Sequence, residues 1–218
     1  MGCAGSQGGV VVSDQFYLQD SRGDVGDRLS FWATKGCGYT TNLDGTELFT
    51  KESAEWHYKG RETDVPWPKE YIDARSETAC DMQYVCLDDE GAAQLGDECL
   101  VQRKNSYNGN DLVWVSVTSG YTTNVDLAQV MTASEAKACC AANPNHVAWA
   151  KPYIDARVRR VVTRRHVNLK EALRGTGIEI IKPKRPRKDR INCNGCGRFL
   201  YEDAIYSDCP HCGADNRP

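Results

Sequence analysis

Four cysteines near the end of the chain have the types and spacing of a metal site. They form two Cys-x-x-Cys pairs, Cys193 with Cys196 and Cys209 with Cys212, and twelve residues separate the pairs. Each pair can form a tight turn, and two such turns can place four thiolates tetrahedrally around zinc. Four protein ligands leave no position for water, so the spacing predicts one structural Zn²⁺ rather than a catalytic one.

The second of these pairs has the sequence Cys-Pro-His-Cys-Gly, and residues 191–218 resemble a zinc ribbon. A redox-active dithiol is the alternative, but it would place one pair at the start of a helix in a larger fold. His211 could replace a cysteine as ligand, although Cys212 has the better spacing. The other seven cysteines lie mostly in apolar settings, which favours burial as small hydrophobic residues. Whether they include a second metal site stays open.

A strip of basic residues precedes the cysteines. Residues 157–190 contain 13 Lys and Arg against three acids, whereas residues 1–156 carry a net charge of −11. One interpretation is an arm that contacts nucleic-acid phosphates, although it lacks aromatic residues for base stacking. The other is a solubilising linker, or an arm that binds the acidic part of its own chain. The candidate nucleic-acid-binding residues are Lys182, Lys184, Arg185, Arg187, Lys188 and Arg190.

The longest pattern in the chain is an internal repeat. Gly-Tyr-Thr-Thr-Asn at 38–42 recurs at 120–124, and the match runs on to 71–75 and 153–157 with 16 identities in 38 positions. This predicts a tandem duplication. Turn chemistry explains Gly and Asn, whereas a polar pocket or partner surface present twice is the functional alternative. The candidate binding residues are Tyr39, Thr40, Thr41 and Arg75 in the first copy and Tyr121, Thr122, Thr123 and Arg157 in the second.

Short strands and one helix are expected to position these residues in each copy. Thr50 is a predicted N-cap for a helix over 51–59, and Thr132 with Glu135 forms a predicted capping box for a helix over 136–142. Asn168 is a predicted cap for a further short helix, 169–174. The predicted strands are 16–18, 29–32, 47–49, 71–75, 82–87, 153–157 and 178–181.

These elements predict an α+β fold of two tandem small antiparallel-sheet-plus-helix repeats followed by a zinc ribbon. No apolar run approaches the roughly 20 residues needed to span a bilayer, so no membrane partner is expected. The predicted divisions are a flexible N-terminus (1–15), repeat unit one (16–80), a connector (81–98), repeat unit two (99–157), a basic helix and linker (158–190) and the ribbon (191–218).

Parts of the first repeat resemble small uncharacterised accessory proteins of tailed bacteriophages and prophages. The resemblance covers the first repeat well, the second loosely and the basic strip hardly at all. It implies an accessory protein made in the cytoplasm of a bacterial host cell. The residues that carry it are 16–22, 31–32, 38–43, 49–52 and 67–74.

The sequence contains no evident catalytic constellation. It has neither a phosphate-binding glycine loop nor a nucleophile elbow, and its histidines do not recur in the repeat: His57 aligns with Cys139, and His146 with Asp64. We therefore expect a non-enzymatic binding protein whose acidic, duplicated part engages a host protein, for example in counter-defence, or a small ligand. A nucleic-acid-binding protein that uses the basic arm and ribbon is the alternative, and an enzyme with a site between the repeats is a third.

Overall fold

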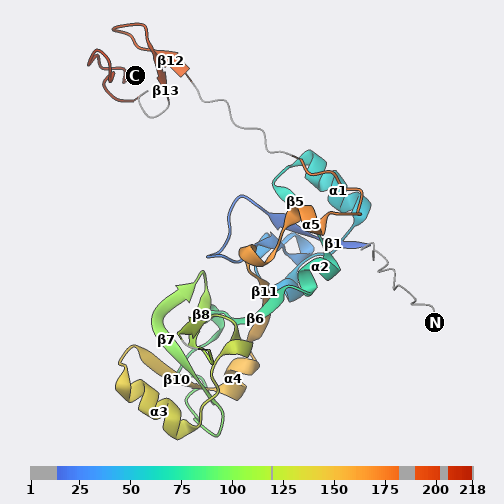
Figure 1. Ribbon diagram of the computed structural model, residues 1–218, viewed down its shortest axis with the longest axis vertical. Coiled ribbons are helices and arrows are strands. Elements are labelled where there is room, and N and C mark those ends of the chain that lie inside the picture. Colours follow the sequence, from blue (N-terminus) through green and yellow to red (C-terminus); the bar gives the residue numbers. More distant parts are fainter. Residues whose placement is uncertain (1–13, 119, 182–189, 202–205, 218) are drawn as a thin grey trace, which may run out of the picture. The chain divides into compact units, whose positions relative to one another are not determined.

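The chain divides into two compact units, the body (residues 1–181) and the C-terminal module (residues 182–218) (Figure 1). The computed structural model describes residues 14–118, 120–181, 190–201 and 206–217. Residues 1–13 of the predicted flexible N-terminus lie outside these ranges. Helices occur together with antiparallel sheets, so the predicted α+β class is confirmed.

In the first half of the body (residues 15–84), strand β1 pairs with three other strands of a five-stranded antiparallel sheet. The sheet order is β3-β2-β1-β4, and β5 also pairs with β1. Every residue of β1 after Gln15 is buried, which makes it the centre of this half's core. The elements are β1 (Gln15–Asp20), β2 (Phe31–Trp32), η1 (Thr34–Gly36), β3 (Tyr39–Thr40), η2 (Leu43–Gly45), β4 (Phe49–Thr50), α1 (Lys51–Gly60), β5 (Asp64–Pro68), α2 (Lys69–Asp73), β6 (Ser76–Cys80) and η3 (Met82–Tyr84), where η denotes a 3-10 helix.

The second half (residues 99–166) has a four-stranded sheet in the order β10-β7-β8-β9. Helix α3 packs against β7 and β10 (Figure 1). The buried Trp149 donates a hydrogen bond to Gln102, and in the first half Trp67 donates to Gln19 in the same way. The elements are β7 (Cys99–Asn108), β8 (Asp111–Val115), β9 (Tyr121–Thr122), η4 (Val125–Leu127), α3 (Ala133–Ala142), β10 (His146–Ala150), α4 (Lys151–Asp155), β11 (Val158–Val162) and η5 (Arg164–His166).

The two predicted helices and their caps are confirmed. Thr50 accepts a hydrogen bond from the backbone N–H of Ser53 at the start of α1. Thr132 does the same for Glu135 at the start of α3, and the Glu135 carboxylate accepts from the Thr132 N–H at 2.8 Å, which completes the capping box.

The strands predicted at 71–75 and 153–157 are wrong. Both segments lie in short helices, α2 and α4, and in the turns that follow them. The Arg75 guanidinium lies 3.6 Å from the centre of the Tyr71 ring, and Arg157 lies 3.7 Å from that of Tyr153. A contact between residues four apart is a helical spacing, because strand residues four apart are too distant to stack.

Two other predicted strands are also wrong. Residues 82–87 begin with the 3-10 helix η3 and continue without strand pairing, and residues 178–181 form no ladder. Ile181 instead donates its N–H to the Tyr58 hydroxyl at 3.1 Å, while Ile178 enters the core of the first half. The Tyr58 side chain, rather than a neighbouring strand, therefore accepts the hydrogen bond from the Ile181 N–H.

A two-stranded ladder joins the two halves. β6 pairs antiparallel with β11, and Thr78 lies opposite Arg160 at its centre. Isolated bridges extend the ladder on both sides, one between Arg28 and Thr163 and one between Asp81 and Asp111. The ladder and its two flanking bridges are referred to below as the junction.

Two glycine loops meet beside the junction. Gly26 and Gly109 both have positive φ, of 65° and 60°, which non-glycine residues rarely adopt. A Cβ on Gly109 would lie 2.5 Å from the carbonyl oxygen of Val25, and one on Gly26 would overlap Asn108 and Gly109. Only glycine allows the two loops to approach this closely.

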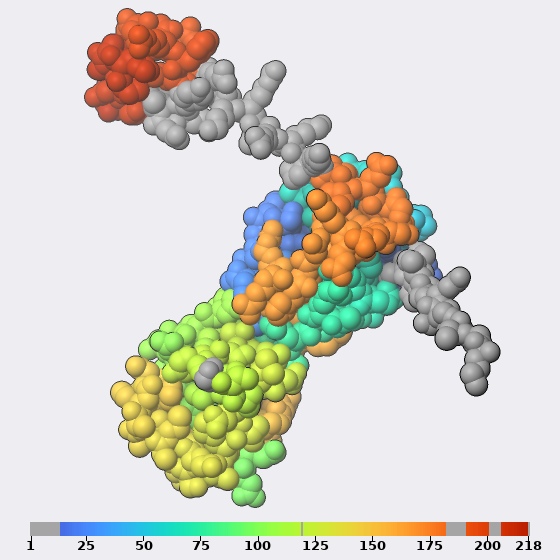
Figure 2. All heavy atoms as spheres, in the orientation of Figure 1, coloured from blue at the N-terminus to red at the C-terminus, as the bar shows by residue number. Residues whose placement is uncertain are grey.

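Residues 158–181 belong to the body, although the sequence predicts a basic helix and linker over 158–190. β11 is part of the junction, and α5 (Leu169–Ala172) packs with Leu173 on the core of the first half. In Figure 2 this segment forms the orange part of the surface of the body. Asn168 caps α5 as predicted, by accepting from the N–H groups of Lys170 and Glu171.

The C-terminal module contains a small antiparallel ladder. Its strands are β12 (Arg190–Asn192) and β13 (Phe199–Tyr201), which flank the first cysteine pair. Leu200 forms a small buried cluster with Cys193 and Cys209. Across the described part of the whole chain, no helix has the length and apolar character needed to cross a membrane.

Candidate metal centre and polar pocket

The four cysteines predicted as metal ligands lie together in the C-terminal module. The Sγ atoms of Cys193, Cys196, Cys209 and Cys212 all lie within 4.8 Å of one another. Sγ of Cys193 is 3.6 Å from that of Cys212, and Sγ of Cys196 is 3.8 Å from that of Cys209. The cluster can hold a metal ion through four sulfur ligands.

The backbone around the sulfurs has the same form in both cysteine pairs. Gly197 and Gly213 donate their N–H groups to the carbonyls of Cys193 and Cys209 at 2.9 and 2.8 Å, and both glycines have positive φ. Backbone N–H groups, those of Cys196 and then Gly195, lower the pKa of the Cys193 thiol to about 6. Such donors stabilise thiolates, which are the metal-binding form of cysteine.

Two residues near the cysteines have different roles from the ligands. His211 is exposed, and its Nδ1 lies 3.2 Å from Arg198, outside the sulfur cluster, which agrees with the preference for Cys212. Asn216, which the sequence analysis missed, accepts from the N–H of Asn194 and donates to the carbonyl of Ala214. It thereby ties the two cysteine turns together.

The threonines of the repeated turn, Thr41 and Thr123, lie at the junction. Each accepts a hydrogen bond from a buried arginine of the opposite half. Arg159 donates to Thr41, and Arg28 donates to Thr123 at 2.7 Å. These two threonines therefore link the halves of the body.

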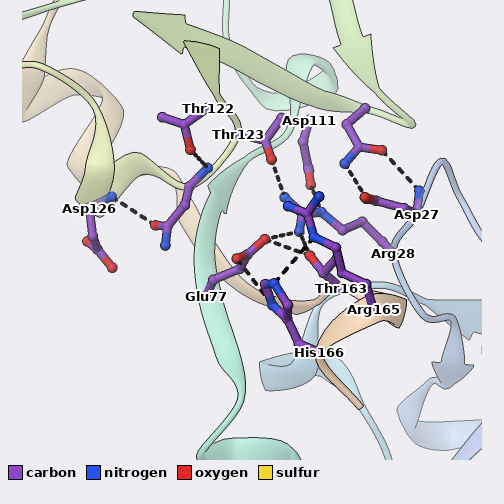
Figure 3. Close-up of polar contacts among 12 residues, drawn as sticks. Asp27, Arg28, Glu77, Asp111, Thr122, Thr123, Asp126, Thr163, Arg165 and His166 are labelled. Atoms are coloured by element: carbon purple, nitrogen blue, oxygen red, sulfur yellow. Dashed lines mark hydrogen bonds and ion pairs between the residues drawn. The ribbon is translucent and has the colours of Figure 1, made fainter. Parts of the chain in front are cut away.

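A buried charge network surrounds these threonines, and Figure 3 shows the part around Thr123. Arg28 pairs with Asp111 at 2.7 Å and with Glu77, and it also donates to Thr163. Arg28 and Asp111 are 1% and 0% exposed, so both charges are removed from water. Burial raises the pKa of Asp111, which opposes the effect of its two arginine partners.

The network continues on the other side of the junction. Arg159 pairs with Asp111 at 2.6 Å and with Asp81 at 3.0 Å. Upstream of position 38 the repeat alignment continues after a one-residue shift, in which residues 26–29 align with 109–112 and Arg28 corresponds to Asp111. Glu77 corresponds to Arg159 at the spacing of 82 residues. The same positions thus carry opposite charges in the two halves. At the first of these positions the exchange lies between two identities of the repeat, Gly26 with Gly109 and Leu29 with Leu112.

A polar pocket opens beside Arg159. Its volume is about 300 Å³, and residues of both halves line it. Tyr39, Thr40, Thr41 and Asn42 of the repeated turn form one wall, and Asp81, Gln83, Tyr84 and Asn110 lie around the rest. Three of the predicted binding residues in the first copy therefore share one cavity.

Tyr39 and Thr40 keep hydrogen-bonding capacity at this wall. The Tyr39 hydroxyl accepts from Arg22 and Arg61, each at 3.0 Å, so its own proton is left to donate. Thr40 accepts from the N–H of Asn42 at 3.1 Å and likewise retains its proton. Tyr39 is 40% exposed, so a ligand can reach it.

The predicted binding residues outside the pocket divide among other contacts. Arg75 and Arg157 stack on tyrosines as described, and Arg157 also lines a separate open cavity of about 530 Å³ with the acidic connector. Thr122 accepts from the N–H of Asn124 within its turn. Tyr121 is exposed and lies in contact with His146, with 3.0 Å between its hydroxyl and Nε2.

His146 also contacts Cys139, with 3.4 Å between Nδ1 and Sγ. No motif in the sequence marks this thiol and imidazole as neighbours. No repeated pattern marks them, because the aligned residues in the first half are Asp64 and His57.

Part of the basic strip pairs with acidic residues of the first half. Arg160 pairs with Asp44 at 2.8 Å and with Asp73 at 3.0 Å, and Arg164 pairs with Asp24 at 2.6 Å. Together with Arg159, these contacts support internal docking for the start of the strip. The candidate nucleic-acid residues Lys182, Lys184, Arg185, Arg187 and Lys188 lie outside the described residues, as does the side chain of Arg190.

Comparison of the chain with protein-family models, curated proteins and solved structures gives no match.

Proposed function

We propose that this chain is a non-enzymatic binding protein that holds a small polar ligand in the pocket beside Arg159. The proposal rests on the pocket itself, which has the turn residues Tyr39, Thr40 and Thr41 along one wall. The pocket combines residues of both halves, so the folded body is needed to form it. Ligand sites commonly use such clefts, with a few convergent polar groups.

The body is proposed to be a fused pair of duplicated units. The order of elements, the two tryptophan–glutamine contacts and the helix caps correspond in the two halves. At the junction, each bridge has a counterpart at the aligned positions, as in an isologous dimer interface. The pocket would then be one of two equivalent places, which diverged after duplication.

Side-chain amides give a direct test of ligand binding. Asn42, Gln83 and Asn110 line the pocket, so their NH₂ signals should shift in nuclear magnetic resonance spectra when the ligand enters. Probes should cover four classes: neutral saccharides, nucleosides, amino acids and inorganic phosphate. If no class shifts these signals while the fold is intact, the proposal of a small-ligand pocket is wrong.

The C-terminal module is proposed to be a zinc ribbon with one structural Zn²⁺. Four thiolates with tetrahedral spacing suit zinc, and iron is the chief competitor for such a ligand set. Metal analysis of the full chain should give one zinc per chain, and Cys212→Ser should lower that content. Iron in place of zinc would overturn the metal assignment but keep the site.

The resemblance to bacteriophage proteins supports a role as an accessory protein inside a bacterial host cell. The acidic body then offers a second kind of partner, a host protein, whose basic surface it would meet by charge complementarity. Counter-defence is one such role. Affinity purification of the body from an infected host tests it, and recovery of no host protein at physiological salt would contradict it.

A nucleic-acid-binding function is the second candidate. It is favoured by the composition of residues 182–190, which contain six basic residues and one acid. Because bound phosphates release counterions, affinity for labelled DNA or RNA should fall steeply with salt. A chain ending at residue 181 keeps the body and should lose this binding. Equal binding by both chains would exclude the strip as the contact.

A further inference from the structure

We infer that the pocket beside Arg159 takes a neutral saccharide of one or two rings. This inference rests on the proposed function, since it names the ligand class for the same pocket. Its basis is the combination of a charge-balanced wall, unoccupied amide and hydroxyl groups, and two accessible tyrosine rings.

The charged side chains at the wall of the pocket already pair with one another. Arg159 is the cation in the wall, and it pairs with both Asp81 and Asp111. An anionic ligand would approach two carboxylates and compete for a guanidinium that they already hold. A neutral ligand avoids this repulsion and can still use the polarity of the wall.

One donor of this wall lacks a partner. Arg159 is only 9% exposed, and its Nε is buried with no hydrogen-bond acceptor among the residues that the structure describes. An unpaired buried donor destabilises a protein unless something satisfies it. This nitrogen has almost no accessible surface, so a ligand in the pocket does not reach it, and the ligand contacts come from the other polar groups of the wall.

The remaining polar groups match hydroxyls. The side chains of Gln83 and Asn110 make no hydrogen bond within the described residues, and Asn42 uses only its carbonyl oxygen, to accept from Asp44. An amide offers donors and an acceptor together, and a sugar hydroxyl is likewise both donor and acceptor. Thr40 adds a hydroxyl group at the same wall.

The tyrosines supply apolar faces. Tyr84 is 65% exposed and Tyr39 is 40% exposed, and both line the cavity. Aromatic rings with a polar tip suit ligands that have one apolar and one polar side. The C–H face of a pyranose has this character. The volume of about 300 Å³ limits the ligand to one or two such rings.

The aligned place across the junction carries different chemistry. Gln83 and Tyr84 of the pocket align with Arg165 and His166, which Figure 3 shows on the other side. Arg159 and Asp81 align with Glu77 and Thr163, which Figure 3 also shows. Tyr121 and Asn124 keep the counterparts of Tyr39 and Asn42, but the amide of Gln83 and the phenol ring of Tyr84 have no counterpart there. We expect one saccharide per chain, and the aligned residues provide matched controls.

The experiment is a titration of the full chain with each probe. Its readout is the nuclear magnetic resonance signals of the side-chain amides of Asn42, Gln83 and Asn110. The saccharide probes are glucose, galactose, mannose, N-acetylglucosamine and maltose; adenosine, uridine and inorganic phosphate are the comparison. At least one saccharide should shift these signals saturably, with a stoichiometry of one. Tyr84→Ala should weaken its binding about five- to tenfold, as expected for loss of one aromatic contact. His166→Ala should leave it unchanged.

The outcomes separate the inference from the proposed function. Shifts caused by a nucleoside or by phosphate, without a saccharide, would overturn the inference while the small-ligand pocket stands. Saccharide shifts that His166→Ala weakens as much as Tyr84→Ala does would also overturn it, because the ligand would then lie elsewhere. No shift from any probe would overturn the inference and count against the pocket itself. Tyr84 is exposed, so its replacement leaves the core intact.

Discussion

Arg28 and Asp111 contact each other where neither side chain reaches water. A buried ion pair gives little net stabilisation compared with apolar residues, because removing two charges from water is costly. Loss of one partner is different, since the other charge then stays buried and unpaired. The network at the junction therefore makes the body sensitive to single substitutions at a few positions.

Asp111→Asn should lower the free energy of unfolding of the body by about 3–5 kcal/mol. The asparagine keeps the size of the side chain but leaves Arg28 and Arg159 without their shared carboxylate. Urea unfolding followed by tryptophan fluorescence measures the loss. Glu55→Gln is the control, because Glu55 pairs with Lys59 on the surface of α1 and its loss should change little. Equal effects of the two variants would contradict a buried network.

Glu77 should make stability fall in acid. Burial acts to raise its pKa, but hydrogen bonds from Thr163 and Arg28 outweigh burial, so its pKa lies below the usual 4.5. The folded state thus binds this proton more weakly than the unfolded chain does. Its contribution is complete above pH 4.5 and is lost as the pH falls through the lowered pKa.

Unfolding free energies of wild type and Glu77→Gln, measured between about pH 6 and pH 3, test this linkage. The variant should be less stable near pH 6 and should lose less stability on acidification. Parallel pH profiles for the two proteins would contradict the assignment.

At the scale of elements, the glycine loops decide how closely the halves approach. Gly109→Ala should be more destabilising than Gly38→Ala, although both glycines have positive φ. At Gly38 the added methyl meets open space and only the backbone is strained, by about 1–2 kcal/mol. At Gly109 it also collides with Val25, which adds about 1–3 kcal/mol of overpacking. Thermal unfolding compares the two variants, and equal losses would show that the loops can separate without cost.

Local signals in the sequence predict much of this fold but not its junction. The helix caps Thr50 and Thr132 and the cysteine spacing follow from short-range chemistry, and all were predictable. The strands at 71–75 and 153–157 were predicted wrongly, because strand-forming residues outweighed the Tyr–Arg spacing of four that marks α2 and α4. The pocket was not predictable, because it forms only where Arg159 and Asn110 lie near Tyr39 in the fold. These residues are more than 70 positions from Tyr39 in the sequence.

At the scale of the whole molecule, the metal centre and the body belong to separate compact units. Removing the metal with a chelator should unfold the C-terminal module and leave the thermal midpoint of the body unchanged. All five tryptophans lie between residues 32 and 149, so their fluorescence reports on the body alone. The amide signals of Gly197 and Gly213 report on the module. A chelator-induced drop in the tryptophan-monitored midpoint would show that the units depend on each other.

The exchanged charges at the junction have a consequence for assembly. Two first halves brought together in the same way would bury Arg28 against Arg28, and two second halves would bury Asp111 against Asp111. The junction surface of each half therefore disfavours binding to a second copy of itself and favours binding to the other half. A body divided within the connector, between residues 90 and 91, should reassemble from its two fragments as an obligate heterodimer. Mixing the separately purified fragments and weighing the product by native mass spectrometry would show this directly.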